Sequence, residues 1–135
     1  MNDINQAMNN LKKLEKMAVR VGITSKNYLV YVNTDDGGNI PHFHYVDEAT
    51  RGKDSKKGFH TCIKLEVPEY FNHEGKEDKL SSKQKKELNE FLRKPFDRPK
   101  FQGTNWDYIV MIWNMNNLDK NIDEDQEIPD YTKLK

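Results

Sequence analysis

The sequence has no pair of cysteines to form a disulfide, no long apolar run and no recognisable signal segment. Its single cysteine, Cys62, cannot form an intramolecular disulfide, so nothing in the sequence favours an oxidising compartment. No run of residues approaches the roughly 20 apolar residues that span a bilayer, and the amino terminus lacks a basic segment followed by an apolar one. We therefore expect a cytoplasmic protein with no membrane partner.

The sequence also lacks an excess of charge of either sign. Lys plus Arg and Asp plus Glu number 22 each, so the overall field gives no general attraction to nucleic acid or to anionic membranes. Trp, Tyr and Phe together are too frequent for a disordered chain. A length of 135 residues suits one domain with a single core. We expect residues 1–117 to form this domain and residues 118–135 to be a flexible acidic tail.

Three segments have the residue types and the alternation of β-strands. A stretch rich in turn formers, 34–39, separates the first two, and a long polar loop, 47–58, separates the last two. Both connections allow neighbouring segments to pair antiparallel. The predicted strands are 28–32, 40–46 and 59–67.

Three other segments carry apolar residues at helical spacing. The first covers 3–20, the second starts after a capping box at Ser81 and ends before Pro95, and the third starts at Thr104. A strand at 108–113 is an alternative within the third segment, because that run is continuously apolar. These patterns predict an α+β fold, in which an antiparallel sheet of three or four strands packs against two or three helices.

The predicted strand 40–46 has polar side chains on one face and aromatic side chains on the other. Successive side chains of a strand point to opposite faces, so His42 and His44 share one face while Phe43 and Tyr45 share the other. If the aromatic pair lies in the core, the histidines lie on the opposite face.

The predicted strand 59–67 alternates in the same way. His60 and Cys62 fall on one side, and Ile63 and Leu65 fall on the other. When the apolar residues of both strands fill one core, the two strands together present three imidazoles and one thiol on a single face.

Imidazole and thiolate are ligands of Zn²⁺ and of other late transition metals. One interpretation is a metal site at His42, His44 and His60, with zinc as the cofactor of a metal-dependent enzyme. The alternative is that the histidines are hydrogen-bonded and Cys62 is a small buried apolar residue, with no metal. In that case the face, together with Glu48, could bind another protein. No catalytic residue is predicted, because neighbouring His60 and Cys62 leave no third group to orient them.

A second candidate site is the basic segment 76–100, in which Lys and Arg outnumber the acidic residues. On a helix these residues could contact a phosphate backbone. Interspersed Glu87 and Glu90 are also typical of an ordinary solvated helix face. The candidate nucleic-acid patch is Lys83, Lys86, Arg93 and Lys94.

The run Ile40-Pro41-His42-Phe43-His44-Tyr45, preceded by Asp35-Asp36, resembles the core of a family of small bacterial proteins. That family is an uncharacterised domain with an acidic turn and a Pro-Pro-His-Phe-His-Val motif. Asn105-Trp106 is similar to an Asn-Trp pair farther along the family pattern. In this chain Ile40 replaces the first proline, the loop after Tyr45 is longer, and the amino-terminal helix and acidic tail are extra.

The resemblance implies a small α+β domain, often encoded beside toxin and antitoxin genes, with no settled activity. An Asn-, Lys- and Asp-rich composition is also typical of AT-rich genomes and their phages. We therefore favour a small interaction or regulatory module, antitoxin-like or accessory to a mobile element, that uses the His42 and His44 face. We expect its partner to be another protein, such as one encoded nearby. The metal-dependent enzyme and the nucleic-acid-binding protein are the two alternatives.

Overall fold

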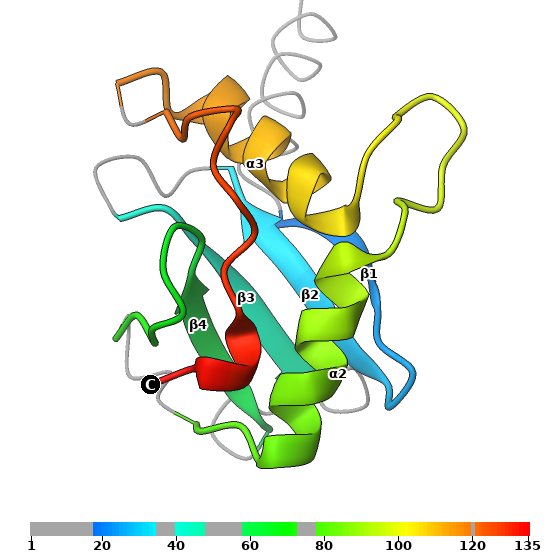
Figure 1. The fold of residues 1–135 in the computed structure, drawn as a ribbon, viewed down its shortest axis with the longest axis vertical. Coiled ribbons are helices and arrows are strands. Elements are labelled where there is room, and N and C mark those ends of the chain that lie inside the picture. The colour runs from blue at the N-terminus through cyan, green and yellow to red at the C-terminus, as the bar shows by residue number, and fades with distance from the viewer. Residues whose placement is uncertain (1–17, 35–39, 48–57, 73–77, 120) are drawn as a thin grey trace, which may run out of the picture.

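A computed structural model describes residues 18–34, 40–47, 58–72, 78–119 and 121–135. Over these residues it contains four strands, two α-helices and one short 3₁₀-helix, which confirms the α+β fold (Figure 1). The elements are β1 (Ala18–Ile23), β2 (Tyr28–Asn33), β3 (His42–Asp47), β4 (His60–Lys64), α2 (Ser82–Arg93), α3 (Asn105–Asn116) and η1 (Tyr131–Lys133).

The four strands form one sheet in the order β1-β2-β3-β4, and each neighbouring pair is antiparallel. Sequential strands therefore lie side by side throughout, which is the commonest arrangement of strands that follow one another in sequence. The β1–β2 turn uses Asn27 with a φ of 68°, a left-handed conformation that asparagine tolerates better than most residues. Three of the four strands were predicted, and β4 ends at Lys64, three residues earlier than expected.

The fourth strand corrects a prediction. A helix running to Arg20 was expected, but Ala18–Ile23 is the edge strand β1. Val19, Val21 and Ile23 are β-branched residues at alternate positions, and pairing with β2 satisfies one side of the segment's backbone. The rest of the predicted helix, 3–17, lies outside the described residues.

Gly22 has a packing role instead of ending a helix. A Cβ atom at this position would lie 3.0 Å from Cζ of Phe91 on α2, so a larger residue would require the Phe91 ring to shift. The register of β1 also shifts between Arg20 and Gly22, which is the mark of a β-bulge. The absence of a side chain at Gly22 thus lets the ring of Phe91 on α2 pack closely against β1.

The helices pack on the sheet to form one core. α2 and η1 cover the face that carries Phe43, and α3 crosses the end of the sheet at which β2 ends and β3 begins (Figure 1). The fully buried side chains come from all of these elements. The largest are Trp106, Trp113, Tyr45, Tyr131, Phe43, Leu29, Ile63, Leu65, Leu88, Leu92, Ile109 and Ile122.

Both described helices begin as predicted. Ser81 and Gln84 form a reciprocal capping box at α2, and Thr104 and Asp107 form another at α3. Each box satisfies two backbone N–H groups that the first turn would leave without partners, and an N-cap of this kind contributes about 1 kcal/mol. The strand alternative at 108–113 is wrong, since these residues lie within α3.

The carboxy-terminal segment is packed, which corrects the expectation of a flexible tail. Ile122, Tyr131 and Leu134 are buried in the core cluster. The Tyr131 hydroxyl donates to the backbone oxygen of Lys64 at 2.7 Å, and its ring meets that of Phe43 edge to face at 5.8 Å. The apolar residues here are too widely and irregularly spaced to form a helical or strand period.

Two buried tyrosines with different surroundings give a matched stability test. Tyr131→Phe removes the hydrogen bond to Lys64 and should lower the free energy of unfolding by about 1 kcal/mol. The hydroxyl of Tyr45 is buried with no hydrogen-bond partner among the described residues, so Tyr45→Phe should leave stability unchanged or slightly higher. Urea unfolding of the two variants and the wild type measures both effects. Equal losses in the two variants would contradict this account of the carboxy-terminal contact.

Candidate metal site

The register between β3 and β4 decides which side chains meet. His44 lies opposite Cys62, and His42 lies opposite Lys64, while His60 lies opposite Val46. Residues paired across an antiparallel ladder share a face. His42, His44, His60 and Cys62 therefore occupy one face of the sheet, as the alternation predicted.

Three of the four side chains on this face are buried. His42 is 1% exposed, and His44 and Cys62 are 0% exposed, whereas His60 is only partly buried. Buried side chains do not by themselves offer a surface to a partner, and the interaction role of the His42 and His44 face stays a prediction. Glu48, which we had included in this surface, lies outside the described residues.

Aromatic side chains account for part of the burial. The ring of Tyr31 stacks on that of His44 with centroids 4.5 Å apart and an angle of 9° between the planes. The centroid of His42 lies 4.6 Å from that of Phe71 and 5.7 Å from that of Trp113 on α3. These contacts hold both imidazoles in fixed orientations.

His44 lies at the centre of a polar network. Its Nδ1 is 3.0 Å from Nε2 of His60 and 3.4 Å from Sγ of Cys62. Its Nε2 is 3.2 Å from the side-chain amide of Asn33, and the hydroxyl of Tyr31 lies 3.2 Å from Nε2 of His60. One ring thus connects a thiol, a second imidazole and an amide.

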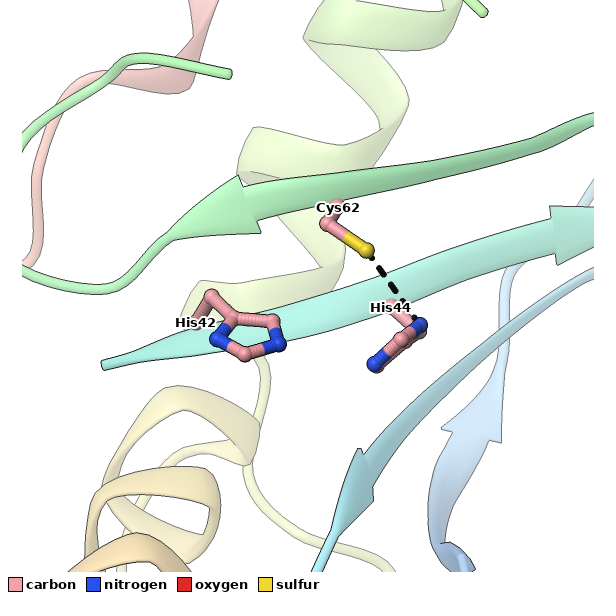
Figure 2. Close-up of side chains that lie close together, drawn as sticks. All are labelled: His42, His44 and Cys62. Carbon is pink, nitrogen blue, oxygen red and sulfur yellow. Dashed lines mark hydrogen bonds between the residues drawn. The ribbon is translucent and has the colours of Figure 1, made fainter. Parts of the chain in front are cut away.

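Three of these side chains are close enough to share one metal ion. One ligand atom from each of His42, His44 and Cys62 lies within 4.8 Å of the other two. Figure 2 shows the sulfur of Cys62 directed at the ring of His44, and the ring of His42 beside them. In a tetrahedral zinc site, ligand atoms lie about 3.3–3.6 Å apart, so the ligand atoms need to approach by about 1–1.5 Å at most.

The hydrogen bond of His42 prepares it as a ligand. Its Nδ1 lies 2.7 Å from the backbone oxygen of Ile40, and only a protonated nitrogen can donate to a carbonyl. In the neutral ring this places the proton on Nδ1 and the lone pair on Nε2. Metal-binding histidines are commonly oriented by such a backbone carbonyl.

The group differs in one member from the set predicted from sequence. We expected His42, His44 and His60, but the close group contains Cys62 in place of His60. Cys62 lies directly opposite His44, whereas His60 is one same-face position farther along β4 and farther from His42. His60 still contacts His44, so it borders the group.

One of the four residues in the candidate nucleic-acid patch, Arg93, has a structural role. Lys83, Lys86, Arg93 and Lys94 are all exposed. The guanidinium of Arg93, however, donates to the backbone oxygens of Ile128 and Pro129 at 3.1 Å each, and it also contacts the side chain of Asn89. Arg93 therefore attaches the carboxy-terminal segment to α2.

Comparison with protein-family models, with curated proteins and with solved structures gave no match to this chain. The resemblance to the Pro-Pro-His-Phe-His-Val family stays a prediction. Among the helices that the structure describes, none is long and apolar enough to cross a bilayer.

Arg93 offers a test of its structural role. Arg93→Gln removes the hydrogen bonds to the two backbone oxygens and should lower the free energy of unfolding by about 1 kcal/mol. The loss is modest because the guanidinium is partly exposed to solvent. Lys86→Gln removes the same charge from an exposed position on α2 and should change stability by less than about 0.5 kcal/mol. Chemical unfolding measures both variants. If the two behave alike, Arg93 does not attach the carboxy-terminal segment.

Proposed function

We propose that this protein is a metal-binding domain in which one Zn²⁺ ion links β3 to β4 through His42, His44 and Cys62. The observation that carries the proposal is the group of three buried ligand atoms that all lie within 4.8 Å of one another. Two ligands come from β3 and one from β4, so the ion cross-links neighbouring strands.

The donor set favours zinc among the common ions. Two imidazoles and a thiolate are borderline-to-soft ligands, which Zn²⁺ binds well and which Mg²⁺ and Ca²⁺ do not prefer. The separation of 3.4 Å between Nδ1 of His44 and Sγ of Cys62 is close to the edge of a zinc tetrahedron, about 3.6 Å.

Burial favours a structural ion over a catalytic one. Catalytic zinc keeps a position open for water or substrate, whereas structural zinc has four protein ligands. With His42, His44 and Cys62 all buried, we assign the fourth position to His60, whose Nε2 is 3.0 Å from Nδ1 of His44. His60 lies outside the group of three close ligand atoms, so its imidazole would have to move toward the ion to complete the site.

The proton requirements at His44 support the same assignment. Its Nδ1 has both His60 and Cys62 within reach, yet a ring nitrogen either donates one hydrogen bond or accepts through one lone pair. Coordination to a common ion lets all three groups interact favourably at once. The Nε2–H of His44 would then need an acceptor. Asn33 supplies one if its amide group is turned by 180°, since its nitrogen Nδ2 now lies 3.2 Å from Nε2.

The test is zinc binding by protein purified without a histidine tag and freed of metal. We expect one equivalent of Zn²⁺ to bind and, at free zinc about 100-fold above Kd, to raise the free energy of unfolding by about 2.7 kcal/mol. Cys62→Ser changes one atom and should lower zinc affinity at least tenfold. Because zinc must compete with protons for imidazole and thiolate, affinity should also fall steeply between pH 7 and pH 5.

Two comparisons make the result specific. Mg²⁺ at the same concentration should give no stabilisation, because it requires oxygen ligands. Tyr45→Phe, on the opposite face of the sheet, should bind zinc as the wild type does. Less than a tenth of an equivalent of zinc on the folded wild type, or unchanged affinity in Cys62→Ser, would contradict the proposal.

A further inference from the structure

A groove of about 640 Å³ runs along the outer side of α3, away from the metal site. It is lined by residues of α3, by Phe101 and Gln102 of the preceding connector, and by Leu118 and Glu124 after the helix. Phe101, Val110 and Met111 contribute apolar surface to it. None of the four metal-site side chains lines it, so the two sites can be tested separately.

Large apolar side chains of this groove are exposed to solvent. Met115 is 67% exposed and Leu118 is 80% exposed. Met111, Met115 and Leu118 follow each other at spacings of four and three residues, which places them in one stripe along and just beyond α3. A continuous apolar stripe in a groove is a feature of interaction sites, whereas scattered exposed apolar residues are ordinary. Methionine side chains are also flexible enough to adapt to a partner.

The charge around the groove has one sign. Its two charged lining residues, Asp107 and Glu124, are both acidic. Of the residues after α3, Leu118 and Glu124 line the groove, and the sequence around Glu124, 119–127, contains five acidic residues and a single lysine. Although the whole chain has a formal net charge of zero, this region is therefore strongly negative.

We propose that the groove binds an amphipathic basic helix of a partner protein. Apolar side chains of the partner, at positions i, i+3, i+4 and i+7, would contact the stripe of Met111, Met115 and Leu118. Lysines or arginines on the flanks of that helix would face Glu124 and its acidic neighbours. The negative charge disfavours nucleic acid and anionic membranes as occupants, because both carry the same sign. The interaction role predicted from sequence is thus placed on α3 and not on the histidine face.

A pair of synthetic peptides tests this proposal by fluorescence anisotropy. The first is an 18-residue helix with leucines at the four contact positions and lysines on its flanks, and the second has glutamate in place of every lysine. We expect the basic peptide to bind at least tenfold more tightly than the acidic one. Its affinity should fall as salt rises, because salt screens the exposed charges.

Variants assign the binding to the groove. Met115→Ser combined with Leu118→Ser should weaken the basic peptide at least tenfold without changing the unfolding midpoint, because both side chains are already exposed. Glu124→Lys should weaken the basic peptide and strengthen the acidic one. The control is Ile23→Ser on β1, which removes an apolar residue that is 43% exposed and should leave binding unchanged.

Three outcomes would overturn the proposal. The first is equal binding of the basic and acidic peptides, and the second is no detectable binding of the basic peptide at low salt. The third is self-association of the wild-type protein that the double serine variant abolishes, because it would make a second copy of this chain the occupant of the groove.

Discussion

The pairing of β3 with β4 is the constraint on which the rest of this structure depends. It sets His44 opposite Cys62 on one face and Phe43 opposite Ile63 on the other. Side chains alternate along a strand with a period of two, so a slip of one residue would exchange every side chain between the two faces. Such a slip would bury imidazoles under α2 and remove Phe43 from the core. The imidazoles are buried in the observed register too, but there His44 has the polar partners Asn33 and Cys62. A buried polar group without a partner costs more than one that is hydrogen-bonded, so the observed register is the stable one.

The two faces of the sheet then serve different purposes. One forms the apolar core with α2, α3 and the carboxy-terminal segment. The other gathers three histidines and the only cysteine of the sequence, and burial of His42, His44 and Cys62 suits a closed metal site. In our account the metal stabilises the sheet, and α3 offers the partner-binding surface on its outer side. On these two proposals the domain would be a small interaction module that zinc stabilises.

The sequence predicted those features that depend on local pattern. Alternation in 40–46 and 59–67 was sufficient to place four ligand-type side chains on one face, and Ser81 and Thr104 marked the starts of α2 and α3. Where two local patterns overlapped, the prediction was wrong. Ala18 and Val21 continue a helical spacing, while Val19, Val21 and Ile23 also alternate, and only pairing with β2 decides between them. Such pairing is a tertiary interaction that no local propensity contains.

The remaining errors have the same origin in long-range contacts. Tyr131 is anchored by a bond to Lys64 and by Arg93 holding the preceding residues, contacts that join positions more than thirty residues apart. Membership of Cys62 in the metal group in place of His60 follows from register, which is decided by the whole sheet. Burial of the histidine face likewise depends on Phe71 and Trp113, which lie far from β3 in sequence.

X-ray absorption spectroscopy at the zinc edge of the zinc-loaded protein tests the central claim most directly, because it reports the ligands of the ion itself. Our account predicts one sulfur at about 2.3 Å and three nitrogens at about 2.0–2.1 Å, with the sulfur contribution missing in Cys62→Ser. A coordination shell of nitrogen and oxygen alone in the wild type would place the ion elsewhere and would contradict a site built on His42, His44 and Cys62.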